Sequence, residues 1–263
     1  MAKQPSLFLP HGAPDLLLTD HPAKRFMAEL GSRVGRPQAI LVVSAHWESP
    51  RLALTSAEAP ETVHDFFGFP AALYDYRYPA QTDAAVSRRV TEQLADLGHA
   101  VEADAGRGFD HGAWVPLLLA FPEADIPVVQ LSLLAGGTAR QHFEIGEALA
   151  PLRDEGVMIV GSGSVTHNLR VLGPEGATPP QWATGFDDFV SFSVERGDWD
   201  TLMQFPDAPA SAQRAHPTPE HFLPFFVAAG AGTADHGTLL HRSFSHGSIS
   251  MAAFSFGADR LAA

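Results

Sequence analysis

Short apolar runs alternate with amphipathic stretches along this chain of 263 residues. Many residues in the runs are β-branched, and proline or glycine bounds them, which is typical of buried strands in an α/β protein. Four of the runs are SLFLP at 6–10, AILVVSA at 39–45, IPVVQLSL at 126–133 and GVMIVGSGS at 156–164. The alternation predicts an α/β fold with a central mixed sheet flanked by helices.

The segments between these runs carry the start and stop signals of helices. TDAAVSRRVTEQLADLG begins with Thr82 or Asp83 as candidate N-cap and ends at Gly98. In TPEHFLPFFVAAGAG, Thr218 is the expected cap and Pro219 the first helical residue. Three further expectations are helices over TARQHFEIGEALAPLRDEG and PQWATGFDDFVSFSVERGD and a closing strand over GSISMAAFSFG.

Composition limits the classes of protein that the chain can be. No internal repeat or long linker divides it, so a single domain over residues 1–263 is expected. The net charge of −13 argues against a nucleic-acid or anionic membrane partner. No segment approaches the roughly 20 apolar residues that span a bilayer, the N-terminus lacks a secretory signal, and there is no cysteine. These features favour a soluble cytoplasmic protein, and they leave open whether it is a monomer or a homodimer.

Histidines follow several of the predicted strands. His11, His46 and His167 come after the first, second and fourth apolar runs. In open α/β sheets, functional groups gather beyond the carboxyl ends of the strands. A single histidine there is usually just hydrogen-bonded to backbone, but three at one edge suggest a metal site, because neutral imidazole is the commonest protein metal ligand. No HExxH or HxH motif is present, so this interpretation depends on topology.

Six blocks of the sequence, taken in order, resemble the class III extradiol aromatic ring-cleavage dioxygenases, in particular the 4,5-DOPA dioxygenase subfamily. They are LPHGAP, VVSAHWE, HDFFGFP, FDHGAWVPL, GSGSVTHNL and AHPTPEHFLPFFVAAGA, and they extend from residue 6 to about residue 256. The resemblance implies a small single-domain enzyme with its active site at the carboxyl ends of the strands. Its reaction would cleave the ring of a small aromatic diol, a DOPA-like catechol, next to the hydroxyls with O₂. It also implies one divalent metal ion per chain, and family members are described with either ferrous iron or zinc.

The resemblance further implies roles for individual residues. The family's first two metal-binding histidines fall on His11 and His46. Its third falls within AHPTPEH, where His221 is preferred to His216. His167 matches the acid/base position. The positions that would bind substrate fall on His64, Asp65, Phe67 and His216.

Ring cleavage sets chemical requirements on such a site. Three protein ligands on one face of a metal leave positions for two catechol oxygens and O₂. Zinc is redox-inert, so activity is expected to require Fe(II) even where zinc is bound. A neutral histidine beside the metal can accept a catechol proton, which is the role expected for His167. His111 is the second expected catalytic residue, a hydrogen-bond donor whose tautomer Asp110 would fix.

Two other functions are compatible with the same histidines. A zinc-dependent hydrolase could use three histidines and an open position to activate water. A non-catalytic metal-binding protein would hold the ion without turnover of any catechol or ester. Oxygen uptake in the presence of a catechol distinguishes these alternatives from a dioxygenase.

Overall fold

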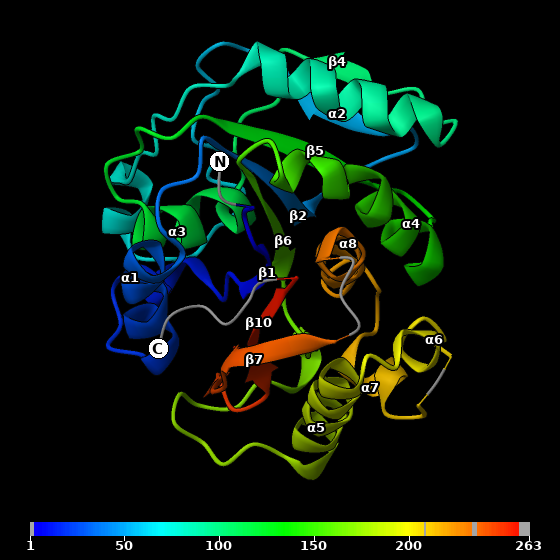
Figure 1. Cartoon of the computed structure of the whole chain (residues 1–263). Helices are drawn as coiled ribbons and strands as arrows, with labels where there is room; N and C mark the ends of the chain where they lie inside the picture. The colour runs from blue at the N-terminus through cyan, green and yellow to red at the C-terminus, as the bar shows by residue number, and fades with distance from the viewer. Residues whose placement is uncertain (1–2, 208, 233–235, 258–263) are drawn as a thin grey trace.

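A computed structural model describes residues 3–207, 209–232 and 236–257 (Figure 1). Within this part of the chain the main sheet has eight strands in the order β4-β3-β5-β2-β6-β1-β10-β7. The strands are β1 (Ser6–Pro10), β2 (Ala39–Ser49), β3 (Ala53–Thr55), β4 (Glu102–Asp104), β5 (Val128–Leu134), β6 (Val157–Gly163), β7 (Gly237–His241) and β10 (Ala253–Phe256). A separate hairpin pairs β8 (Phe244–Ser245) with β9 (Ile249–Ser250). The sheet is mixed, because β5, β2, β6 and β1 run parallel while β10 is antiparallel to β1 and β7.

Helices cover both faces of this sheet. The α-helices are α1 (Pro22–Val34), α2 (Ala84–Asp96), α3 (His111–Ala120), α4 (Ala139–Leu149), α5 (Gln181–Arg196), α6 (Trp199–Leu202), α7 (Ala212–Ala215) and α8 (Leu223–Gly232). Short 3₁₀ helices are η1 (Pro14–Leu17), η2 (Ala71–Asp75), η3 (Ala150–Arg153) and η4 (Leu169–Val171). Helices α1 and α3 lie on one side of the sheet, and α4 and α8 lie on the other (Figure 1). No helix of the described residues is long and apolar enough to cross a membrane.

The alternation of side chains along β2 explains the two layers. Ile40 and Val42 belong to the apolar cluster under α1 and α3. Leu41 and Val43 belong to the cluster that contains the buried residues of α4 and α8. Successive side chains of a strand point to opposite faces, so a run that is apolar throughout is buried on both sides, as the sequence indicates.

The α/β fold and its mixed sheet are confirmed, and all four predicted core strands are present. Two strand predictions differ clearly from the structure. The second strand continues to Ser49 rather than ending at residue 45. The C-terminal segment forms two short strands, β9 and β10, of which β10 closes the sheet beside β1.

The predicted start of α2 is confirmed, whereas the predicted start of α8 is wrong. The Asp83 side chain accepts hydrogen bonds from the N–H groups of Ala85 and Val86 and caps α2. The expected start at Thr218 is wrong, because α8 begins at Leu223. Pro224 is the second residue of α8, in the first turn, where the missing N–H of a proline costs no intrahelical hydrogen bond.

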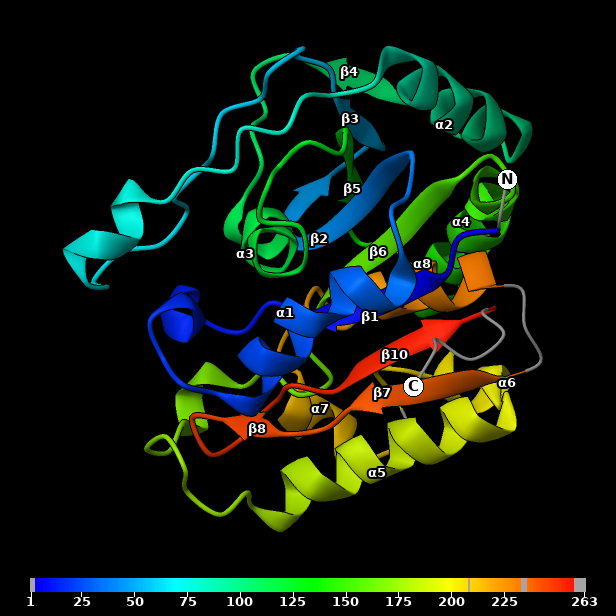
Figure 2. The ribbon, with the colours of Figure 1, turned by 60° about the vertical axis from the view of Figure 1, so that its left-hand side comes forward.

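One segment extends away from the body of the fold. The chain between β3 and α2, which contains η2, projects past the end of the sheet (Figure 2). It returns through Tyr78, which is buried with the apolar cluster on the α1 and α3 side. Its first half carries the HDFFGFP block, so this projection brings phenylalanines toward the carboxyl ends of the strands.

Candidate metal centre

Three neighbouring parallel strands bring the histidines together. Strand β6 lies between β2 and β1, so the carboxyl ends of all three meet at one edge. His11 follows β1 directly, and its N–H donates to the Gly163 carbonyl at the end of β6 (3.4 Å). His167 lies four residues beyond β6, where its N–H donates to the Ala215 carbonyl (2.8 Å).

An irregularity in β2 presents His46. Val43 pairs with Leu131 and Glu48 pairs with Leu133, so residues 44–47 of β2 stand opposite a single residue of β5. Extra residues of this kind bend a strand and redirect its side chains. The His46 ring therefore reaches the histidine cluster, while Trp47 is buried and the Arg107 guanidinium lies over its ring, 5.0 Å from the centroid.

A glycine at the end of β6, Gly163, allows the backbone of His221 to pack closely against this strand. A Cβ atom at Gly163 would lie 2.1 Å from the His221 carbonyl oxygen, which is closer than real Cβ contacts. That carbonyl accepts a hydrogen bond from the Ser164 N–H (2.8 Å). The glycine-rich end of β6 thus fixes the backbone of the segment that carries His221 just before α8.

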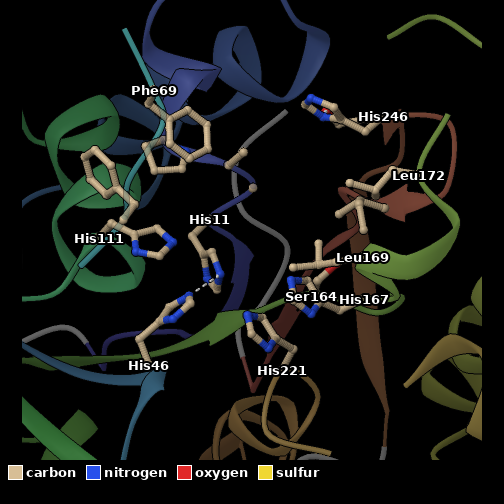
Figure 3. Close-up of a pocket in the computed structure, with 16 residues that line it drawn as sticks. His11, His46, Phe69, His111, Ser164, His167, Leu169, Leu172, His221 and His246 are labelled. Carbon is tan, nitrogen blue, oxygen red and sulfur yellow. Dashed lines mark hydrogen bonds between the residues drawn. The ribbon is translucent and has the colours of Figure 1, made fainter. Parts of the chain in front are cut away.

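The side chains of His11, His46 and His221 converge (Figure 3). Ligand nitrogens of the three lie within 4.8 Å of one another. The Nε2 atoms of His11 and His46 are 3.1 Å apart. Two nitrogens bound at 2.0–2.1 Å to one ion would lie roughly 3.0–3.4 Å apart, so this separation suits two ligands of a single metal.

Hydrogen bonds on the opposite ring nitrogens determine which nitrogens are free. The Ser162 hydroxyl donates to the Gly112 carbonyl, so it accepts from Nδ1–H of His11 (3.0 Å). The Glu220 carboxylate, which can only accept, lies 2.9 Å from Nδ1 of His221. In both rings Nε2 is then the unprotonated nitrogen, and Nε2 of His221 is buried without any hydrogen-bond partner. A metal ion fits this donor set, because unpaired lone pairs on buried nitrogens are otherwise costly.

Burial keeps these imidazoles neutral. Desolvation, with neighbouring histidines as a second cause, lowers the pKa of His11 and His221 well below the ordinary value. The same causes lower the pKa of His46 to about 4, although Asp110 and Asp65 act in the opposite direction. Neutral imidazole is the form that binds a metal.

Two more histidines lie beside the cluster. The His167 ring stacks on the His221 ring with centroids 3.4 Å apart and planes 7° apart. Burial lowers its pKa to about 4, partly opposed by Glu220. The His111 ring centroid lies 4.0 Å from that of His46.

Asp65, rather than Asp110, orients His111, which corrects the prediction. One Asp65 carboxylate oxygen accepts from Nδ1 of His111 (2.9 Å) and from its backbone N–H (3.0 Å). Burial acts to raise the pKa of Asp65, but the hydrogen bonds and charge of His111 lower it to about 2. The sequence alone did not indicate this pair, because the two residues are 46 positions apart.

Asp110 instead holds a buried network that sequence reasoning missed. Its carboxylate accepts from the Ser44 hydroxyl (2.6 Å), from Arg107 (2.6 Å) and from the Gln130 side chain, and it caps α3. The Ser44 hydroxyl also accepts from the His46 N–H, while Arg107 donates to the His46 carbonyl. Asp110 therefore fixes the backbone of His46 on both sides.

A cavity of about 370 Å³ opens over the cluster (Figure 3). Its lining includes the three histidines of the cluster together with His111 and His167. Phe66 and Phe69 form one wall. The remaining lining comes from 12–14 and from Ser164, Leu169, Leu172, Ser245, His246 and Ile249. None of the last six was singled out in the sequence, although Ser164 and Leu169 lie within the GSGSVTHNL block and Ile249 lies in the predicted closing strand.

Several predicted substrate-binding residues lie elsewhere. The Phe67 side chain is 92% exposed, and the cavity lining does not include it. His216 is buried among phenylalanines, stacked on Phe222, with Nε2 bonded to the Val165 carbonyl (2.7 Å). His64 lies behind Phe66, where its Nε2 contacts the Tyr76 carbonyl (3.1 Å). Asp65 is not among the lining residues; its carboxylate lies behind two that are, 2.9 Å from Nδ1 of His111 and 3.8 Å from Nδ1 of His46.

Comparisons with known proteins agree with this geometry. The family described as the catalytic LigB subunit of aromatic ring-opening dioxygenase matches residues 8–257. The chain belongs to the LigB family. Its relatives include proteins named 4,5-DOPA dioxygenase extradiol from Beta vulgaris, 39% identical over 95% of this chain and 96% of the relative, and from Escherichia coli, 42% identical over 97% and 95%. A crystal structure of an uncharacterised E. coli K12 protein has a TM-score of 0.81 at 38% identity, covering 97% of this chain and 100% of the other.

Membership of the LigB family confirms the resemblance on which the sequence interpretation depended. The chain is a ring-cleaving dioxygenase, an oxidoreductase that acts on an aromatic substrate with O₂. The family works with a metal ion, and the histidine cluster is a group of described residues that could hold it. The match favours neither a zinc hydrolase nor a non-catalytic metal-binding protein.

Proposed function

We propose that this LigB-family chain is an Fe(II)-dependent extradiol dioxygenase whose substrate is a catechol with a DOPA-like side chain. His11, His46 and His221 would hold the metal. The observation that carries the proposal is the set of Nε2 atoms in the cluster: two are 3.1 Å apart and a third is buried without a partner. The names of the relatives support the class of substrate.

The identity of the metal follows from the chemistry of the reaction. Bound Fe(II) would supply open positions for both catechol oxygens and O₂ and a path for electrons between them, which redox-inert zinc lacks. The protein's own contribution is to hold three neutral imidazoles in a cavity that phenylalanines shield from water.

Two further histidines would handle protons and hydrogen bonds. His167 lines the cavity and is neutral near pH 7, since burial lowers its pKa to about 4. It can therefore accept a proton from a catechol hydroxyl and later return it. His111 donates a hydrogen bond from Nδ1–H to Asp65, so its Nε2 is the nitrogen left for the cavity. In this tautomer Nε2 would accept a hydrogen bond from a substrate hydroxyl, in place of the donor role expected from the sequence.

The aromatic ring of the substrate would lie against Phe66 and Phe69. Both line the cavity, and their rings meet edge to face with centroids 5.5 Å apart. This wall replaces Phe67 and His216 in the proposal, because neither contributes to the lining. We further propose that residues 1–263 form one catalytic domain, since lining residues come from His11 through to Ile249.

Oxygen uptake tests the proposed function. Protein stripped of metal and reloaded anaerobically with Fe(II) should consume O₂ and give a ring-opened product from a catechol. Zinc-loaded protein should do neither. Equal turnover with zinc, or ester hydrolysis without oxygen uptake, would contradict the proposal and favour the hydrolase.

A further inference from the structure

The two ends of the cavity differ in chemistry. The metal-binding end is lined by histidines, whereas Leu172 lies farther along the cavity, on the side of His246 (Figure 3). Leu169 and Ile249 also line the cavity. No aspartate, glutamate, lysine or arginine is among the described lining residues. A catechol whose hydroxyls face the histidine cluster would direct its ring substituent toward the side of Leu172 and His246. Any polar group on that substituent needs a partner there.

His246 offers a ring nitrogen to this part of the cavity. Ser164 and Ser245 also line the cavity, but both hydroxyls donate to groups of the protein. Ser164 donates to the carbonyls of Thr166 and Ser250 (both 2.8 Å), and Ser245 donates to Glu175 (2.8 Å). Figure 3 shows His246 across the cavity from His46.

Hydrogen bonding fixes which nitrogen of His246 is free. Since the Ser245 hydroxyl gives its proton to Glu175, it accepts from Nδ1–H of His246 (2.9 Å). Nε2 of the neutral ring is then an unprotonated nitrogen that can accept a hydrogen bond. An acceptor of this kind recognises a donor, such as an ammonium group, rather than a carboxylate.

The turn that carries His246 is held from both sides. Its backbone has φ +48°, an uncommon conformation for a residue with a side chain. Its N–H donates to Glu175 (2.9 Å) and its carbonyl accepts from the Gly173 N–H (2.8 Å). Strained backbone that the surrounding structure enforces is concentrated at functional sites.

The charge beside His246 is negative. The Glu175 carboxylate lies 3.6 Å from Nδ1 of His246. Burial acts to raise its pKa, but hydrogen bonds from the His246 backbone and Ser245 and the nearby histidines lower it, so the group is ionised at neutral pH. A carboxylate at this position, in a protein of net charge −13, attracts a cationic group and repels an anionic one.

From these contacts we infer that His246 and Glu175 form a subsite for an ammonium group on the side chain of the catechol. This inference rests on the proposed function, because it takes the ring hydroxyls to lie at the histidine cluster. His246 accepts a hydrogen bond from the ammonium group, and Glu175 supplies the opposite charge. The pair is thus a specificity determinant: it selects among catechols by the charge of the substituent and takes no part in ring cleavage.

Binding of three matched catechols to zinc-loaded protein tests the subsite without turnover. The probes are ethylcatechol, aminoethylcatechol and carboxyethylcatechol, which share a ring and differ in charge. Calorimetry should give the tightest binding for the aminoethyl compound and the weakest for the carboxyethyl compound. Tightest binding of the carboxyethyl compound would overturn the inference and would direct attention to the exposed Arg170 on η4.

Two substitutions test whether His246 and Glu175 cause the preference for the ammonium group. His246→Gly removes the ring and relieves the positive φ, and should weaken aminoethylcatechol binding about tenfold, the effect of losing a hydrogen bond to a charged group. Glu175→Gln should weaken it by about two- to fivefold, as expected for a partly exposed charge. In both variants the ratio of the affinities for aminoethylcatechol and ethylcatechol should fall. It should stay at the parent value in the matched control His236→Gly, at an exposed histidine outside the cavity lining.

Two results on these variants would overturn the inference. One is a cation preference that survives both substitutions, and the other is an equal loss of affinity for the neutral and cationic compounds. The proposed function is judged separately, by oxygen uptake of the Fe(II)-loaded protein with ethylcatechol. That activity can be present while the charge preference is absent, so the two failures are distinguishable.

Discussion

At the scale of single residues, the hydrogen-bond partner of Nδ1 determines which nitrogen of each imidazole carries the proton. Nδ1–H of His11 donates a hydrogen bond to Ser162 and Nδ1–H of His221 donates one to Glu220, which leaves Nε2 of both rings unprotonated. Ser162 lies in the GSGSVTHNL block and Glu220 directly precedes His221 in AHPTPEH, but neither block indicates which ring nitrogen these side chains contact. The sequence was therefore sufficient to single out the histidines, but their hydrogen-bond partners depend on distances that only the folded chain supplies.

His167→Ala separates an acid/base role from metal binding. The variant should keep one metal ion per chain and still bind catechol. Its single-turnover rate should fall by roughly 10²–10⁴-fold, which is what a positioned proton-transfer group typically contributes. His11→Ala and His46→Ala should lose metal instead. Loss of metal from His167→Ala would make that residue a ligand, and an unchanged rate would remove it from the mechanism.

Asp110→Asn tests the network that fixes His46. The carboxylate accepts from four donors, and an amide turns one acceptor into a donor, so unfolding free energy should fall by about 3–5 kcal/mol. Metal affinity should fall about 10–100-fold, as for other residues that orient ligands. Urea unfolding of the metal-free protein and a metal titration measure the two effects.

Ser44→Ala is the control for this substitution, because it removes one donor and leaves the charge intact. We expect a loss of about 1 kcal/mol. If Asp110→Asn lowered stability without any change in metal affinity, Asp110 would support the fold alone.

At the scale of elements, the strands were predictable and the approach of His221 was not. A run such as ILVV must be buried on both faces, so its place in a central strand follows from its composition. The irregularity of β2 at 44–47 and the late start of α8 depend on neighbouring elements, namely β5 and the end of β6. Local signals such as Thr218-Pro219 indicate a turn as readily as a helix start.

Gly163→Ala tests the close approach of β6 and His221. The added Cβ would overlap the His221 carbonyl, so we expect a loss of about 1–3 kcal/mol in unfolding free energy together with weaker metal binding. Thermal unfolding and metal titration measure both.

Gly185→Ala is the matched control, since a methyl group at this exposed position of α5 would meet no heavy atom of another segment within 4 Å. Replacing a helical glycine by alanine there should stabilise by roughly 0.5–1 kcal/mol. Equal effects at the two positions would contradict the packing argument.

At the scale of the whole molecule, the buried histidines make stability depend on pH. Burial lowers the pKa of His216 to about 3 and those of His46 and His167 to about 4, while unfolded histidine titrates near 6.5. Below about pH 6.5 the unfolded chain therefore binds more protons than the folded chain. Stability present above that pH is lost as the pH falls toward the folded pKa values, by on the order of 1.4 kcal/mol per histidine and pH unit.

Urea unfolding of the metal-free protein between about pH 7 and pH 5 measures this dependence, in a window above the titration of most carboxylates. We expect the unfolding free energy to fall steadily below about pH 6.5. The substitution His216→Phe, at a position that lies away from the cluster, should reduce the slope. A flat profile would mean that these histidines are charged in the folded protein.

The most direct test of the account is the position of the metal itself. Anomalous diffraction from crystals of the zinc-loaded protein should give one peak, within about 2.0–2.1 Å of Nε2 of His11, His46 and His221. Two other groups of described residues could hold an ion, His46 with Asp65 and His111, and His167 with Glu220 and His221. A peak on either of those groups would contradict the assignment of the ligands.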